Sequence, residues 1–309
     1  YYLIEFPNTK TFTLSPQYKK ISHMNTEATI TNYSFWIKSS ILLLLWLVTF
    51  YPVYPELYST WMNDPNNSHG MLVPLISAAL IWTKREEIKS TPITYAYMGA
   101  IILVLSLVIY VLAYAGQTAV ISRIMIITTL IGLIIFNFGV PLFKTIAFPL
   151  CYLIFMVPVP VSIYSMVSLP LQLFATNISR FLIQAVNIPV YQEGNMLYFV
   201  QTQLEVAEAC SGLRSMTAFV MLAVLFAYLM KKNWPRRIFM VASAIPLAIV
   251  ANILRVTGTG ILAHFYGEDI AKGFMHEFSG LVVFAFGFVI MIVLFLLLQP
   301  RDEVSKREE

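Results

Sequence analysis

The stretch Glu205-Val-Ala-Glu-Ala-Cys-Ser-Gly-Leu-Arg-Ser215 runs directly into an apolar segment, Met216 to Met230. It carries two carboxylates before Cys210 and an arginine, Arg214, four residues after that cysteine. A helix that only crosses a membrane does not need charged groups at its start, and such groups are costly to bury. We therefore predict that the rest of the chain forms a membrane domain that holds Cys210 at one membrane face.

Composition places the chain among polytopic membrane proteins. Of its 309 residues, 58% are hydrophobic and 12% are charged, and the mean hydropathy is +0.73. A water-soluble domain of this size cannot bury so much apolar surface. We predict an all-α polytopic membrane protein with about eight transmembrane helices, an interfacial amphipathic helix and a small outer hairpin or loop. The expected spans are 35–54, 69–83, 93–115, 118–138, 143–160, 211–230, 236–262 and 276–298.

The chain is expected to have three parts. Residues 1–34 form an N-terminal extension that we expect to be disordered in part, and Met24 is a more natural start than Tyr1. Residues 35–298 form a single transmembrane domain. Residues 299–309 form a charged cytoplasmic tail.

Two segments between the fifth and sixth spans are predicted to lie outside the apolar core of the membrane. Residues 161–189 mix Ser, Gln and Asn with apolar residues, which is typical of a helix in the interface or against the bundle. In 190–207, Gly194-Asn195 between short β-favouring runs predicts a hairpin. With this topology, Lys84 to Lys89 and Lys231 to Arg237 lie on the side of both termini, and the positive-inside rule makes that side cytoplasmic.

The predicted topology brings three complementary side chains to one membrane level. Cys210 starts the sixth span and His276 starts the eighth, both at the outer side, and Arg255 lies in the outer half of the seventh. A thiolate is a nucleophile, and a helix N-terminus lowers the pKa of a thiol. A histidine can pass a proton to a leaving amine, and an arginine can hold a thiolate or an oxyanion. The set predicts acyl transfer or peptide hydrolysis through a thioester.

Several polar residues near this set have more than one possible role. Glu208 either pairs with an arginine or holds the histidine, and Arg214 either joins the chemistry or pairs with Glu208. Asn252 shares a helix face with the predicted catalytic arginine. His69 and His264 also fall on the outer side, and sequence spacing does not exclude either as the base.

Other candidates have structural interpretations. Cys151 is expected to be a small packing residue, and Arg123 and Arg180 are expected to snorkel or to pair locally. The segment His276 to Gly280 begins like HExxH but lacks the second histidine, so no metal site is predicted. We predict no cofactor and no nucleic-acid binding, because the basic residues serve membrane orientation.

Three of these segments resemble the motifs of the exosortase/archaeosortase family. They are Glu208-Ala-Cys-Ser-Gly-Leu-Arg-Ser215, Asn252-Ile-Leu-Arg-Val256 and His276-Glu-Phe-Ser-Gly280. The earlier segment Trp61 to Ser77 resembles the family's segment at the second span. The resemblance covers most of the chain after about residue 35, with the motifs in order.

This resemblance implies a membrane-embedded cysteine protease or transpeptidase in which Cys210, Arg255 and His276 are catalytic. Bacterial members act on secreted proteins with a C-terminal sorting tail, which consists of a short motif of the Pro-Glu-Pro type, an apolar span and a basic cluster. The thioester would be resolved by water or by an unknown surface or exopolysaccharide-linked acceptor. The family implies a multi-pass protein of the inner (plasma) membrane with its active site at the outer, periplasmic face.

A second class, a transporter or flippase with polar groups along a pathway, remains open from the residues alone. It predicts charged groups through the full depth of the membrane, whereas here they gather near one face. A membrane-bound O- or lipid-acyltransferase ranks third, because its usual histidine-plus-asparagine pattern is not evident.

Overall fold

The computed structural model describes residues 33–200, 202–206, 212–230, 233–267 and 274–299, and only the backbone of 33–36, 38 and 274–279. Most of the predicted N-terminal extension, and the tail after residue 299, lie outside this range. The described elements, in chain order, are α2 (Tyr33–Thr49), α3 (Tyr54–Asn63), η1 (Ser68–Met71), α4 (Leu72–Thr83), α5 (Arg85–Ser90), α6 (Tyr97–Ala115), α7 (Ala119–Tyr152), η2 (Leu153–Met156), α8 (Val161–Ala185), β1 (Val190–Glu193), β2 (Met196–Phe199), β3 (Gln203–Glu205), α9 (Leu213–Leu229), α10 (Trp234–Tyr266) and α12 (Phe274–Leu298).

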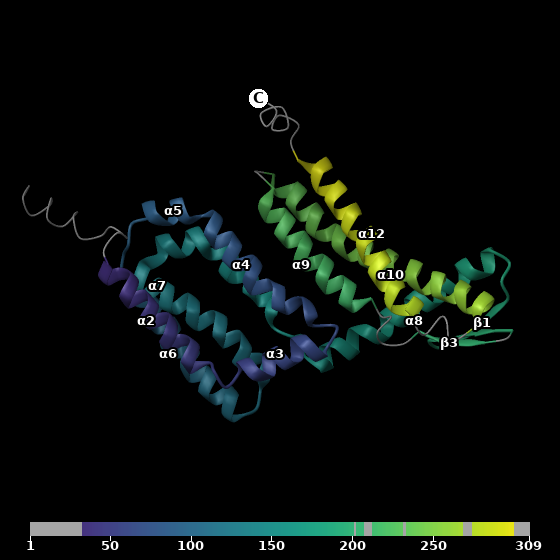
Figure 1. Cartoon of the computed structure of the whole chain (residues 1–309), viewed down its shortest axis with the longest axis horizontal. Coiled ribbons are helices and arrows are strands. Elements are labelled where there is room, and N and C mark those ends of the chain that lie inside the picture. The colour runs from purple at the N-terminus through teal and green to yellow at the C-terminus, as the bar shows by residue number, and fades with distance from the viewer. Residues whose placement is uncertain (1–32, 201, 207–211, 231–232, 268–273, 300–309) are drawn as a thin grey trace, which may run out of the picture.

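The helices form two groups. In Figure 1, α2 to α7 lie together on one side, α9, α10 and α12 lie together on the other, and α8 with the small sheet runs across the end of the second group. The groups meet where α7 touches α9, because Phe148 stacks on Tyr228 with ring centroids 3.7 Å apart. The hydroxyl group of Tyr152 also donates a hydrogen bond of 3.4 Å to the carbonyl of Met221.

The described helices confirm an α-helical multi-pass membrane protein but not the predicted number of eight spans. Five stretches are long and apolar enough to cross a membrane, or six if Ser39–Thr49 and Tyr54–Asn63, which are bent by 71°, form one span. The five are Tyr97–Ala115, Ala119–Met156, Val161–Ala185, Trp234–Tyr266 and Gly280–Leu298. The predicted spans 69–83 and 211–230 appear as shorter apolar helices, Ser68–Thr83 and Leu213–Leu229. At 17 residues, the second rises only about 25 Å, against about 30 Å for the hydrocarbon core.

The predicted spans 118–138 and 143–160 correspond to the stretch Ala119–Met156, which consists of α7 and η2. The chain reverses direction within α7, at Gly139. This glycine has φ 87° and ψ 174°, which are not helical angles. A Cβ on Gly139 would collide with Thr94, just before α6. Both ends of this stretch contact α3. Near its start, Arg123 pairs with Glu56, and at its end the carbonyl of Met156 accepts a hydrogen bond from Trp61. The chain therefore runs away from α3 and returns to it.

Helix α8 covers the predicted interfacial segment. Its length and composition qualify it as a candidate span, although it is much less apolar than α6. Its polar side chains Ser168, Gln172, Thr176 and Ser179 are buried, and the hydroxyl group of Ser179 donates to the carbonyl of Ile253 in α10. Because α8 crosses α9, α10 and α12 in Figure 1 rather than following them, its arrangement fits a helix that covers the end of the bundle.

The predicted hairpin after α8 is present and is extended by a third strand. Strands β1, β2 and β3 form an antiparallel sheet in sequence order, with Glu193 opposite Met196 and Met196 opposite Glu205. Gly194 has a φ of 58° in the first turn. The inner face of the sheet buries Leu197 and Leu204 in a cluster that also contains Val256 of α10. The sheet therefore ends directly before the segment that holds Cys210.

Small residues allow close contact between the helices of the second group. Lipid chains are as apolar as leucine, so helices in a membrane associate through close contact between surfaces of small residues. The core between α9 and α10 contains Ala223, Ala227, Ala244, Ala248 and Ala251. On the α12 side, fully buried Phe219 stacks on Phe284 with centroids 5.1 Å apart. These contacts hold the three helices that lead to the candidate site.

Candidate active site

A cavity of about 690 Å³ separates the η1–α4 segment from α9, α10 and α12. Its lining includes five polar side chains from three elements, namely Ser68 and His69 of η1, Arg214 and Ser215 of α9, and Arg255 of α10. Apolar residues of α4, α9 and α12, together with Pro65 and Gly280, complete the wall. Of the sequence-predicted residues, the structure therefore brings Arg255, Arg214 and His69 to one cavity.

The cavity changes from polar to apolar along two of the segments that line it, η1–α4 and α9. On η1 and α4, Ser68 and His69 are followed about one turn later by Leu72. On α9, Arg214 and Ser215 are followed by Ala218. One helical turn covers 3.6 residues, so the polar and apolar positions of each pair lie on the same face, one above the other. This arrangement suits a ligand whose polar part adjoins an apolar part.

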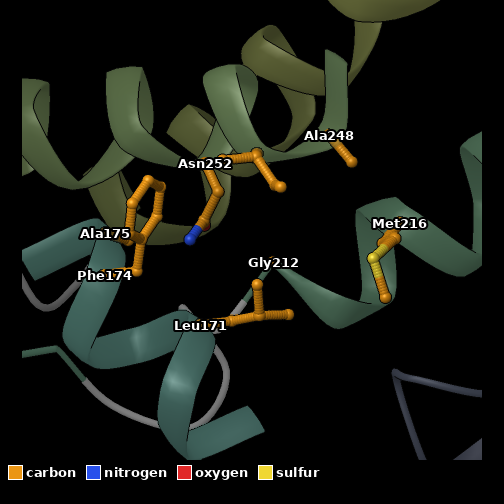
Figure 2. Close-up of a pocket in the computed structure, with 8 residues that line it drawn as sticks. Leu171, Phe174, Ala175, Gly212, Met216, Ala248 and Asn252 are labelled. Carbon is orange, nitrogen blue, oxygen red and sulfur yellow. The ribbon is translucent and has the colours of Figure 1, made fainter. Parts of the chain in front are cut away.

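The start of α9 is fixed to α10 by a glycine contact, which Figure 2 shows beside Leu171, Phe174 and Ala175 of α8. Gly212 has a φ of 79°, and a Cβ at this position would lie 2.9 Å from both Cβ and Cγ of Asn252. The conformation and the close approach both require glycine. Asn252 is thus a bracing residue, one helical turn before Arg255, for the segment that follows Cys210.

We expect Gly212→Ala to reduce activity and to destabilise the protein. An L-residue in the left-handed region costs about 1–2 kcal/mol, and the added methyl group would push the start of α9 away from Asn252. Thermal unfolding and substrate turnover of the purified variant measure the two effects. Gly258→Ala is the matched control, because no atom of α10's neighbours lies within 4 Å of the added carbon. Equal behaviour of the two variants would contradict the bracing role.

Arg255 lies close to the first turns of α12. Its side chain is half-buried, and its Nη1 lies 3.8 Å from the position that a Cβ on Gly280 would occupy. His276 precedes that glycine by four residues, or about one turn of α12, so its backbone lies in the turn beside the cavity. The side chain of His276 lies outside the described residues, as do Cys210 and Glu208.

His69 reaches the cavity because a tight contact fixes its segment. The indole of Trp61 in α3 donates a hydrogen bond of 3.0 Å to the carbonyl of Met156. Gly70 lies against the same indole, and a Cβ there would collide with Trp61. The carboxylate of Asp64 accepts hydrogen bonds from Asn66 and Asn67 in the turn before η1. Trp61 and Gly70 lie in the segment that resembles the family's segment at the second span, although they are not among the predicted site residues.

Arg123 stabilises the helix that precedes this turn. Its side chain is 6% exposed, and its Nη2 lies 3.2 Å from a carboxylate oxygen of Glu56 and 3.4 Å from the hydroxyl oxygen of Thr60. The two partners are four residues apart and so share one face of α3. Of the two roles predicted for Arg123, snorkelling or local pairing, the structure shows pairing, with a partner on another helix. Arg180 pairs within its own helix, since its Nη2 donates to Asn177 at 3.3 Å.

The other histidine and arginine candidates differ in their surroundings. His264 does not line the cavity, and its ring lies 6.1 Å from that of Phe199 in the sheet. Arg214 is exposed and forms no ion pair within the described part of the chain. Its predicted pairing with Glu208 lies outside that part. Cys151 is exposed and away from the cavity.

The described residues contain no group of three or more His, Cys, Asp or Glu side chains that could hold a metal ion. The polar groups among the described lining residues are arginine, histidine and serine side chains. The fold and this cavity define a multi-pass helical membrane protein with a polar site near one end of its second helix group.

Comparison with known families agrees with the resemblance of the motifs. The family model described as transmembrane exosortase matches residues 61–293, which is most of the chain. The chain belongs to the transmembrane exosortase family. No match was found among curated proteins or solved structures.

Proposed function

We propose that this protein is a membrane cysteine transpeptidase or protease that removes the C-terminal sorting tail of secreted proteins. Membership of the exosortase family supports a transpeptidase or protease role in general. The observation that carries the finer proposal is the cavity, which Arg255 and the beginnings of α9 and α12 share. Cys210 precedes the first lining residue of α9 by four residues, and His276 precedes that of α12 by four.

In the proposed reaction, the Cys210 thiolate attacks the scissile carbonyl carbon and forms a carbon–sulfur bond. Arg255 holds the negative charge that develops on the carbonyl oxygen. The carbon–nitrogen bond then breaks, and His276 gives its proton to the departing amine. The acyl group remains on sulfur as a thioester. Water or an acceptor nucleophile then attacks the thioester and gives a proton to His276, which restores its starting state. The carbon–sulfur bond breaks, so water yields a carboxylate or the acceptor yields a new acyl bond, and the thiolate is regenerated.

The graded wall of the cavity supports a sorting tail as substrate. A peptide motif followed directly by an apolar span would place its polar part beside Arg214 and Arg255 and its apolar part beside Leu72, Ala218 and Phe284. The two arginines are suited to hold polar peptide groups by hydrogen bonds. In this proposal the cavity faces the periplasm and the protein resides in the inner membrane. The acceptor is a surface or exopolysaccharide-linked group.

A processing assay tests the proposal directly. The reporter is a secreted protein that carries a Pro-Glu-Pro-type motif, an apolar span and a basic cluster, and it is co-expressed with the full chain. We expect a smaller reporter on a gel only when the enzyme is present. A reporter with the motif scrambled but the span retained should stay intact. A tail that remains attached in the presence of wild-type protein would contradict the proposed function.

The two histidines near the site are expected to behave differently. His276→Ala should lower the processing rate by about 10²–10⁴-fold, which is the usual contribution of a general acid–base group. His69→Ala should lower it by less than about tenfold, because His69 is proposed only to line the site. Initial rates from the two purified variants measure the difference. A large loss confined to His69→Ala would assign the proton transfer to His69 instead.

A further inference from the structure

A second cavity lies at the opposite end of α9 and α10 from the candidate active site. Its volume is about 560 Å³, and its lining is almost entirely apolar. Helix α9 contributes Val220, Val224, Ala227 and Tyr228, α7 contributes Phe148, and α10 contributes Trp234, Arg237, Ile238, Val241, Ala242 and Ile245. We name it the α9–α10 groove.

Arg237 supplies the only charge among the described lining residues of this groove. Its Nε donates a hydrogen bond of 3.1 Å to the carbonyl of Met230, and its Nη2 donates to the same oxygen. An arginine has five N–H donors, so others remain for a second acceptor. Trp234 lies one turn before it and is 72% exposed, which is typical of an indole at a membrane interface.

The length of the groove matches one leaflet of a bilayer. Its wall on α10 runs from Trp234 to Ile245, and at 1.5 Å per residue this is about 16 Å. The hydrocarbon core is about 30 Å thick, so the groove extends to about the middle of the membrane. A sorting tail that crosses the membrane would need the full thickness. Its basic cluster would also be repelled by Arg237.

We propose that the α9–α10 groove binds one anionic phospholipid of the adjacent leaflet. An acyl chain lies along Val224, Val241 and Ile245, and the phosphate accepts hydrogen bonds from Arg237. A guanidinium group is well suited to a phosphate, because its planar donors match the phosphate oxygens. Arg237 also bonds the carbonyl of Met230 at the end of α9. The bound lipid thus fastens the α9–α10 turn at the end away from the active site.

Quenching of Trp234 fluorescence by brominated phospholipids tests this site. The full chain is reconstituted in phosphatidylcholine vesicles that contain equal fractions of either brominated phosphatidylglycerol or brominated phosphatidylcholine. The chain has five tryptophans, so the signal of Trp234 is the difference between wild type and Trp234→Phe. We expect brominated phosphatidylglycerol to associate about fivefold more strongly than brominated phosphatidylcholine. This ratio is the attraction that one basic group near a membrane surface exerts on an anionic lipid.

Variants of the two neighbouring arginines distinguish a site from general surface attraction. Arg237→Gln should remove the preference for the anionic lipid, and Arg237→Lys should retain most of it. Arg236→Gln is the matched control, because Arg236 donates to the carbonyl of Leu298 and does not line the groove. Equal quenching by both lipids in wild type, or equal loss in the Arg236 and Arg237 variants, would overturn the proposal. These measurements do not depend on the processing activity.

Discussion

Cys210→Ala is expected to abolish tail processing, with a loss of at least about 10⁴-fold, because no other side chain in the proposed site can form the thioester. The alanine differs by one sulfur atom and leaves Gly212 against Asn252, so the protein should still fold and insert. The processing assay measures the loss. Unfolding temperature and yield from the membrane fraction report whether folding is retained.

The second cysteine provides the matched control for this prediction. The chain has two cysteines, and Cys151 is exposed outside the candidate cavity. Cys151→Ala should retain wild-type activity and leave Cys210 as the single thiol. A thiol-alkylating reagent should then inactivate this variant and add one label per chain. Processing at the wild-type rate by Cys210→Ala, or an alkylated enzyme that stays active, would exclude a thioester mechanism.

Arg255→Lys is expected to lower the turnover number by about 10²–10³-fold with little change in the Michaelis constant. Loss of one oxyanion-stabilising donor has this magnitude in other acyl-transfer enzymes. Lysine keeps the positive charge but is a single point donor on a flexible chain, whereas the guanidinium group is planar. Nη1 of Arg255 is already near α12, so a shorter side chain with different geometry would leave the developing oxyanion without its donor.

Arg214→Lys provides the comparison in the same cavity. Arg214 is exposed and forms no ion pair with a described carboxylate. A lysine at this position should therefore make the proposed substrate contact, with a loss of activity of less than about tenfold. Steady-state kinetics of Arg255→Lys and Arg214→Lys, measured on protein whose unfolding temperature is unchanged, distinguish an oxyanion contact from a substrate contact. Activity of Arg255→Lys within about threefold of wild type would argue against an oxyanion contact.

The class of the protein and the approximate position of its helices followed from hydropathy and charge. The number of eight spans is not confirmed, because only five of the described helices, or six with the bent pair, have the length and hydropathy of a span. The break between the predicted spans 118–138 and 143–160 coincides with Gly139, which adopts a positive φ beside Thr94. The predicted spans 69–83 and 211–230 are apolar, but their helices are shorter than a full span.

The sequence by itself predicted the chemical identity of the candidate site, because an arginine and a histidine near apolar segments are costly to bury without a partner or a role. It also determined the hairpin, whose turn at Gly194 is a local property of the chain. Only the tertiary structure decided that His69 lines the cavity while His264 packs beside the sheet, and that Gly212 rests on Asn252. Those outcomes depend on side-chain volumes across helices distant in the chain, and periodicity within one helix carries no information about them.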